Sequence, residues 1–289
     1  MIKNFDTNKV YYARGLSSRI YTDIALQLVN EFHRYKIAFG ELPQTSSPLH
    51  IWARDYMPVQ VKEDKFVRFR YDPDYLKSLS EYKPDTKTIL DEIDIKAIDS
   101  DIILDGGNIV SCGDKVIMTD KILQENQHYD KHKLMDKLES LIEAELVLIP
   151  WDVWEEYGHS DGMVRFIKDG RVLLNNYSDF DKSLRKKLLN LLMPHFEVSE
   201  LYYGSHTNYS WAYINFLHVG QHIFIPMMNE DEAQKAFEQI SANYPDCQCH
   251  PIWHCEELIK DGGALNCVTW NIAADLPDVP DYKEIPANQ

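Results

Sequence analysis

Hydrophobic and polar positions along the chain follow two periods, one typical of helices and one typical of strands. Residues 22–36 carry apolar side chains at helical spacing behind a Thr-Asp pair, which predicts an amphipathic helix. Alternating stretches at 51–53 and 59–71 predict strands, and Glu63-Asp64 within the second stretch predicts the turn of a hairpin. The start of the chain therefore combines helical and extended elements.

The same order of elements recurs along the rest of the chain. The pattern predicts hairpins at 102–118, 161–177 and 211–226, helices at 134–145, 182–192 and 230–244, and strands at 146–151, 249–253 and within 262–272. The first two hairpins turn at Gly113-Asp114 and at a Lys-Asp-Gly sequence. No Pro/Gly/Ser-rich linker interrupts the order, so we expect a single domain over residues 1–289.

One polar residue in each unit marks the repeat. Asp55, Asp105, Asp161, Asn215 and Cys267 are separated by 50, 56, 54 and 52 residues. A fixed period of this length indicates a propeller or a repeat array. All-strand blades lack a helix in each unit, so the pattern favours an α/β fold, a closed ring of five ββαβ units. Equivalent strand ends converge on one axis in such a ring, and the five residues would form a single site.

Charge limits the ligands and partners of this site. The chain has 30 Lys+Arg against 46 Asp+Glu, a formal net charge of −16. This balance disfavours nucleic acid, because phosphate backbones need clustered cations, and it favours a small cationic substrate. No apolar run approaches the roughly 20 residues of a membrane span, and no signal peptide is evident, so we expect no membrane partner and a cytoplasmic location. The five cysteines are an odd number in a chain expected in the cytoplasm, so we expect free thiols and no disulfide framework. Whether the chain forms a homo-oligomer is not determined by its sequence.

The candidate residues suggest a reaction. Cys267 and His159 supply a thiol and an imidazole, the minimum for nucleophilic catalysis with a protonated leaving group. A cysteine protease has little use for further carboxylates, whereas those of Asp55, Asp105 and Asp161 suit a planar cation that donates paired, charge-assisted hydrogen bonds. Guanidinium is the obvious cation of this kind. We therefore infer attack by sulfur on a guanidinium carbon.

Four motifs resemble those of a known family. They are Trp52–Pro58 (WARDYMP), Leu104–Ile109 (LDGGNI), Gly158–Gly162 (GHSDG) and Gly262–Cys267 (GGALNC). In this order and spacing they resemble the agmatine deiminase and bacterial-type peptidylarginine deiminase family of the guanidine-modifying superfamily. The resemblance covers about residues 48–272, the Tyr213–Phe216 segment included. It implies the pentein fold, a pseudo-symmetric five-bladed α/β propeller, which agrees with the repeat.

The resemblance implies a hydrolase that converts a guanidino group to a ureido product and ammonia without a metal or organic cofactor. Agmatine is the first expected substrate, with putrescine biosynthesis as its pathway, and arginine or peptidyl-arginine is the alternative. Cys267 would be the nucleophile that forms a covalent thiouronium, and His159 the acid and base. A non-catalytic module that binds guanidinium is a further alternative, although it would have no reason to keep both groups.

The resemblance also implies roles for the carboxylates. Asp55 and Asp161 would clamp the guanidinium nitrogens, and Asp105 stands where the family usually has a Glu that orients the histidine. Further candidates for substrate binding are Trp52, Tyr213 and Asn215. Each has a structural alternative of similar weight: packing in the core or at the rim for Trp52, core packing for Tyr213 and a turn contact for Asn215.

Three positions depart from the family pattern. Met57 replaces a glycine and changes the pocket wall near Asp55. Asp105 is one methylene shorter than Glu, which leaves open whether it contacts His159 directly, through water or not at all. Asn266 stands where agmatine deiminases commonly have His. These departures bear on the substrate more than on the reaction class.

Each candidate also has a purely structural alternative. Cys267 lies in an apolar stretch where core thiols are common. Asp55 could pair with Arg54 or another cation instead of a substrate. A role in turn formation or capping is the alternative for His159, Asp105 and Asp161.

A second group of thiols and imidazoles lies near the end of the chain, at Cys247, Cys249, His250, His254 and Cys255. Its C-x-C-H-x3-H-C spacing matches no common structural zinc pattern. The segment falls where a strand is expected, and alternation sends neighbouring side chains to opposite faces. We therefore expect no metal here.

Overall fold

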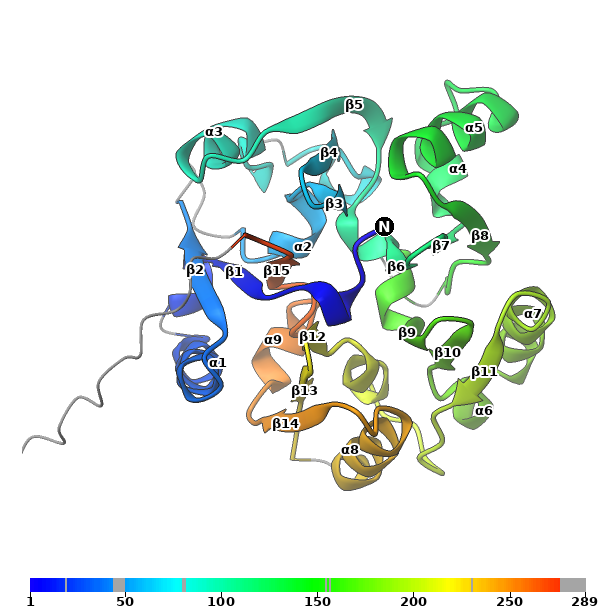
Figure 1. Cartoon of the computed structure of the whole chain (residues 1–289). Coiled ribbons are helices and arrows are strands. Elements are labelled where there is room, and N and C mark those ends of the chain that lie inside the picture. The colour runs from blue at the N-terminus through cyan, green and yellow to red at the C-terminus, as the bar shows by residue number, and fades with distance from the viewer. Residues whose placement is uncertain are drawn as a thin grey trace, which may run out of the picture.

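Five three-stranded sheets surround a common centre in the computed structural model (Figure 1). The structure describes residues 1–18, 20–43, 50–79, 82–153, 155, 157–229 and 231–275. In four sheets an antiparallel hairpin is followed, after a helix, by a third strand that pairs in parallel with the second. The ring of five ββαβ units expected from the repeat is thus confirmed.

The four hairpin sheets follow one another along the chain. Their strands are β3 (Val59–Lys62), β4 (Lys65–Arg70) and β5 (Ala97–Ile103); β6 (Val110–Cys112), β7 (Lys115–Thr119) and β8 (Glu145–Ile149); β9 (Val164–Lys168), β10 (Arg171–Leu174) and β11 (Glu197–Glu200); and β12 (Leu217–Val219), β13 (His222–Pro226) and β14 (Gln248–Ile252). The predicted turns at Glu63-Asp64 and Gly113-Asp114 both lie between paired strands.

The fifth sheet closes the ring with strands from both parts of the chain. Strand β15 (Thr269–Ile272) pairs antiparallel with β1 (Lys9–Ala13), and β1 pairs in parallel with β2 (Ala38–Leu42). This unit repeats the order of the others, but its first two strands are joined by no turn. Neither β1 nor β2 was predicted from the alternation, because each is short and is defined by this long-range pairing.

One longer helix lies between the second and third strands of every unit, on the outside of the ring (Figure 1). These helices are α1 (Thr22–Arg34), α3 (Thr86–Glu92), α5 (Lys131–Ile142), α7 (Lys182–Leu192) and α8 (Glu232–Asn243). The side chains of Asp85, Asp130 and Asp181 cap α3, α5 and α7 by accepting backbone N–H groups. Within the described ranges, no helix has both the length and the apolar character that a membrane crossing requires.

Short helical segments precede the first strand of the hairpins and carry the marker residues. Helix α2 (Ala53–Tyr56) contains Asp55, and the strand predicted over 51–53 is therefore wrong, since its last residue begins this helix. The 3-10 helices Gly106–Asn108, Ser160–Gly162 and Ser210–Ile214 lie next to or contain Asp105, Asp161 and Asn215. Each of these four units thereby delivers one polar side chain to the centre.

Helix α7 offers a test of how the outer helices are held. Leu188 is fully buried in a cluster with β9 and β10 residues, whereas Leu191, one turn further along the helix, is 44% exposed. We expect Leu188→Ala to lower the free energy of unfolding by about 2–5 kcal/mol, because it leaves a cavity. Leu191→Ala should change it by about 0.5 kcal/mol or less. Equal losses in urea unfolding would contradict this packing.

Candidate active site

The marker segments surround a cavity of about 230 Å³, called here the central cavity. It is lined by His50, Trp52, Asp55, Tyr71, Tyr75, Leu76, Tyr82, Tyr157, His159, Gly262 and Cys267. Four of the residues predicted from the sequence, Trp52, Asp55, His159 and Cys267, therefore line it directly. Asp105, Asp161 and Asn215 contact these lining residues from behind.

Cys267 lies just before β15 with its thiol at the cavity surface. The side chain is 6% exposed, its Sγ donates to Asn215 Oδ1 at 3.3 Å, and Sγ lies 4.0 Å from Asp161 Oδ2. Burial, followed by the charges of Asp161 and Asp55, raises the pKa of the Cys267 thiol well above its usual value. The resting group is thus a thiol that faces carboxylates.

His159 lies between two carboxylates. Its Nε2 is 3.0 Å from Asp105 Oδ2, and its Nδ1 is 3.7 Å from Asp55 Oδ1. Burial alone would lower the pKa of His159, but the charges of Asp55 and Asp105 outweigh it and raise this pKa to about 10. The imidazole is therefore protonated at neutral pH. The contact with Asp105 is direct, so the shorter side chain still reaches the histidine.

Asp55 is held by the backbone of the neighbouring unit. The Gly107 N–H donates to Asp55 Oδ1 at 3.0 Å, and a Cβ added at Gly107 would lie 2.6 Å from His159 Nδ1 and 2.7 Å from Asp55 Oδ1. A glycine is therefore required here. The Arg54 side chain turns away from Asp55 and donates to the carbonyl of Asn266 at 3.3 Å. The predicted alternative, an ion pair between Arg54 and Asp55, is therefore wrong.

Asp161 is fixed by the residue that precedes the thiol. The Asn266 side-chain amide donates to Asp161 Oδ2 at 2.6 Å. The side-chain contacts of Asp161 are thus with Asn266 and Cys267, which come from another unit of the ring. Asn266 thus links the carboxylate to the strand of Cys267, a role that its position in the motif did not indicate.

The cavity walls are aromatic, and the sequence reasoning missed most of them. Tyr71, Tyr75 and Tyr82 follow β4, and the Tyr75 hydroxyl donates to Asp105 Oδ2 at 2.7 Å. Their clustering after the strand was the available signal, but none of them follows the repeat. Trp52 also lines the wall, where its ring lies so close to Gly263 that a Cβ there would collide with it.

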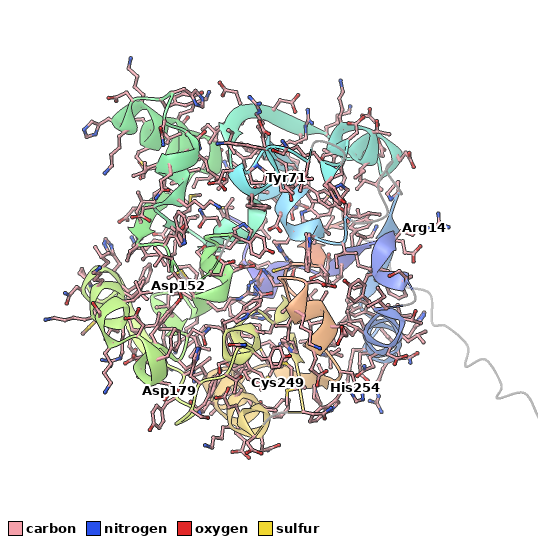
Figure 2. All side chains as sticks on the ribbon, turned by 180° about the vertical axis from the view of Figure 1, so that it is seen from behind. Arg14, Tyr71, Asp152, Asp179, Cys249 and His254 are labelled. Atoms are coloured by element: carbon pink, nitrogen blue, oxygen red, sulfur yellow. The ribbon has the colours of Figure 1, made fainter. Side chains whose placement is uncertain are left out.

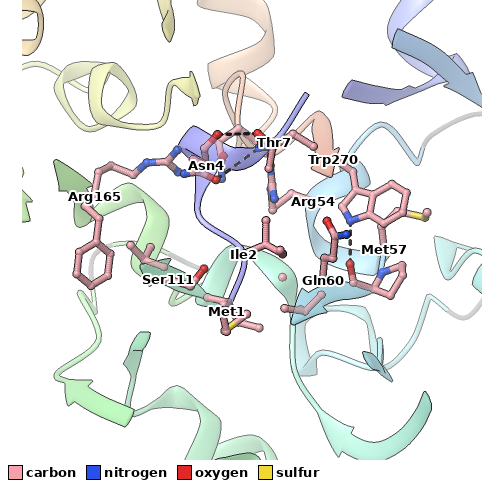
Figure 3. Close-up of a pocket in the computed structure, with 18 residues that line it drawn as sticks. Met1, Ile2, Asn4, Thr7, Arg54, Met57, Gln60, Ser111, Arg165 and Trp270 are labelled. Carbon is pink, nitrogen blue, oxygen red and sulfur yellow. Dashed lines mark hydrogen bonds between the residues drawn. The ribbon is translucent and has the colours of Figure 1, made fainter. Parts of the chain in front are cut away.

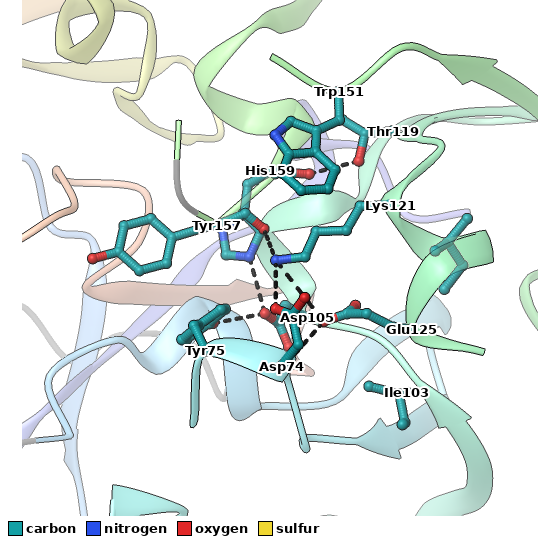
Figure 4. Close-up of polar contacts among 12 residues, drawn as sticks. Asp74, Tyr75, Ile103, Asp105, Thr119, Lys121, Glu125, Trp151, Tyr157 and His159 are labelled. Carbon is teal, nitrogen blue, oxygen red and sulfur yellow. Dashed lines mark hydrogen bonds and ion pairs between the residues drawn. The ribbon is translucent and has the colours of Figure 1, made fainter. Parts of the chain in front are cut away.

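A buried lysine supports this wall from behind. Lys121 is 2% exposed, and its Nζ donates to the Tyr157 carbonyl at 2.7 Å and lies 3.1 Å from Asp74 Oδ1 (Figure 4). The same ammonium group is 5.0 Å from the ring centre of Tyr75. Lys121 therefore joins the segment after β4 to the segment before His159.

Tyr213 does not line the central cavity. It is fully buried in the hydrophobic core, with its ring 5.5 Å from that of Tyr203. The expected role of Tyr213 in substrate binding is corrected to core packing, because its side chain packs within the main hydrophobic cluster, whereas Asn215, two residues later, contacts the thiol.

The cysteine and histidine residues near β14 separate into different contacts. His250 pairs with His222 at 3.0 Å, while Cys247 lies 3.7 Å from His218. Cys249 lies toward the edge of the ring in Figure 2. Among the described residues, no three His, Cys, Asp or Glu side chains are placed to share a metal ion.

Comparison with known proteins gives the family of this chain. The model of the Porphyromonas-type peptidyl-arginine deiminases matches residues 18–272. The chain belongs to this family. No curated protein matches it.

Solved structures of deiminases share the fold. Agmatine deiminase of Enterococcus faecalis is 17% identical with a TM-score of 0.75, and each chain is covered to 96%. The putative arginine deiminase from Porphyromonas gingivalis is 15% identical with a TM-score of 0.75, over 94% of this chain and 97% of that one. The C. jejuni agmatine deiminase is 16% identical with a TM-score of 0.73, and 96% of each chain is covered. The fold is thus the pentein fold of these enzymes.

The protonation of Cys267 can be measured without a substrate. Because its thiol pKa is raised, the rate of alkylation by iodoacetamide should still be rising as the pH passes 9. Asp161→Asn removes a negative charge near Sγ and should shift this profile to lower pH. Peptide mapping by mass spectrometry identifies the modified residue. A profile that levels off near pH 7 would contradict the buried thiol.

Proposed function

We propose that this protein is a deiminase that hydrolyses a guanidino compound, with agmatine as its first substrate. One arrangement carries the proposal: a thiol and a protonated imidazole share a cavity with carboxylates that can bind a planar cation. Asp55 and Asp161 come from different units of the ring. Asp55 lines the cavity together with Cys267, and Asp161 lies 4.0 Å from the Cys267 sulfur. All five cysteines are unpaired, which supports a reducing location such as the cytoplasm.

Substrate binding prepares the nucleophile. A guanidinium held by Asp55 and Asp161 places positive charge beside Cys267 Sγ and offsets the carboxylates that raise its pKa. The thiol then loses its proton to water, and the thiolate attacks the central guanidinium carbon to form a tetrahedral adduct. Asn215, which accepts the thiol hydrogen bond in the resting site, holds Sγ toward the cavity.

His159 serves the two proton transfers that follow. The imidazolium donates its proton to the departing nitrogen, so the C–N bond breaks, ammonia leaves and a thiouronium remains on Cys267. The neutral imidazole then accepts a proton from water as that water attacks the same carbon. As the C–S bond breaks, the hydroxyl proton of the adduct passes to the departing sulfur, the ureido product leaves, and the thiol and imidazolium of the resting site are restored. No step requires a cofactor.

The lining of the central cavity favours agmatine over arginine. Among the described residues that line it there is no Lys or Arg to pair with an α-carboxylate. Aromatic rings instead offer apolar surface for a methylene arm and π-faces for a terminal ammonium group.

A peptidyl-arginine substrate is the second candidate. A neighbouring cavity of about 730 Å³ shares Tyr157, His159 and Gly262 with the central cavity. Such a space would receive the chain on either side of an arginine. This alternative predicts turnover of arginine peptides above that of agmatine.

The test compares agmatine, free arginine and an arginine peptide for ammonia and ureido product. We expect turnover of agmatine by the wild-type protein and only background with Cys267→Ala. Acid quenching during turnover should trap a substrate-minus-ammonia adduct that maps to Cys267. The control is Cys255→Ala, which removes a fully buried thiol away from the cavity and should keep activity. Full turnover by folded Cys267→Ala would refute the proposal.

The pair of His159 and Asp105 determines the alkaline limit of activity. Because Asp105 helps to raise the pKa of His159 to about 10, activity should fall as the pH rises through this value and the acid is lost. Asp105→Asn removes that charge, so the limit should move to lower pH by about one unit or more. Asp105→Glu keeps the charge and should stay near wild type. Identical pH profiles of kcat for all three proteins would exclude this role.

A further inference from the structure

A second, smaller cavity lies behind the segments that carry Asp55 and Cys267. This rear cavity has a volume of about 70 Å³ and shares no lining residue with the central cavity. Arg54 and Asn266 line it, each one residue before a residue of the central cavity. The two motifs therefore present consecutive residues to two different sites.

The charge of the rear cavity is opposite to that of the chain. Its lining includes the guanidinium groups of Arg54 and Arg165 and contains no Asp or Glu, although acidic residues exceed basic ones by 16 in the whole chain. Arg165 is 4% exposed. Figure 3 shows the two arginines on opposite sides of the cavity, with Asn4 and Thr7 between them in this view.

The hydrogen bonds of these arginines leave most of their donors unused. Arg54 donates from Nε to the Asn266 carbonyl at 3.3 Å and from Nη2 to Asn271 Oδ1 at 2.5 Å. Arg165 donates from Nη2 to the Phe216 carbonyl at 3.1 Å. Each guanidinium has five N–H groups, and in the part of the chain that the structure describes neither group forms an ion pair within 4.0 Å.

A buried cation without a paired anion is costly. Burial and the nearby Arg165 lower the pKa of Arg54 to about 10, although Asp161 and Asp55 act on it from a longer range in the other direction. Burial also lowers the pKa of Arg165. The catalytic carboxylates thus compensate the two guanidinium groups only in part, and negative charge inside the rear cavity would stabilise both.

We propose that the rear cavity binds a small inorganic anion, such as chloride or phosphate, between Arg54 and Arg165. The volume exceeds the roughly 10–15 Å³ that, by the same measure, one water needs in a cavity. Ser111 and Thr7 add hydroxyl groups to the lining, and Asn4 and Gln60 add amides. The inference is independent of the proposed deiminase activity, since it rests on the charge and the unused donors of this cavity.

The test measures the thermal unfolding midpoint of the full chain during titration with sodium chloride and, separately, sodium phosphate. Sodium gluconate, whose anion is too large for the cavity, holds the ionic strength constant. An anion bound to the folded state should raise the midpoint along a saturating curve. Bromide soaked into crystals should give an anomalous peak between Arg54 and Arg165.

Two sets of variants locate the effect. Arg165→Gln should weaken binding by about ten-fold or more, because it removes one of the two charges. Arg68→Gln is its matched control, since Arg68 pairs with Asp99 at the surface and should leave binding unchanged. Ser111→Asp places a carboxylate in the cavity wall and should abolish binding, whereas the neutral Ser111→Asn should retain it within about three-fold.

If Arg165→Gln does not fold, the anion titrations of Ser111→Asp and Ser111→Asn still test the site. The two variants at position 111 then provide the comparison, because the Ser111 side chain is only half-buried in β6. A saturating shift that Ser111→Asp alone abolishes supports the site. The absence of a saturating shift with both anions, an unchanged shift in Ser111→Asp, or only water between the arginines in bromide-soaked crystals would overturn it.

Discussion

The charge pair between His159 and its two carboxylates is the interaction on which the site depends. Removing such charges from water is costly, and the cost is met only where the remaining polar atoms find partners. Here the Gly107 N–H and the Tyr75 hydroxyl supply hydrogen bonds to Asp55 and Asp105. The backbone must approach closely to do so, which is why a side chain at position 107 would collide with the imidazole.

The ring explains how residues far apart in the chain form this cluster. The four hairpin units place a short helical segment, and the fifth a turn, before the first strand, and the apolar strands and outer helices hold these segments in fixed positions. Repetition of one unit therefore brings five polar groups, three of them carboxylates, to one centre. The same segments also separate charge, with carboxylates toward the central cavity and the guanidinium groups of Arg54 and Arg165 toward the rear cavity.

Specificity is supplied by parts of the chain that do not follow the repeat. The tyrosines after β4 and Tyr157 form the wall of the central cavity, and Lys121 joins their segments. Gly158 enables this contact, because its φ of +69° and its closeness to the Lys121 side chain exclude a larger residue. The reacting groups are thus fixed by the fold, while the space for the substrate arm is set by loops.

The sequence alone determined the five-fold repeat, the ββαβ order and the residues that meet near the axis, because each is encoded in local periodicity or in a fixed spacing. The tertiary structure decided what depends on contacts between distant segments. It alone paired β1 with β15, directed Arg54 away from Asp55, buried Tyr213 in the core and brought Asp105 within 3.0 Å of His159. A local pattern specifies which residues are buried, but only closure of the ring specifies which of them become neighbours.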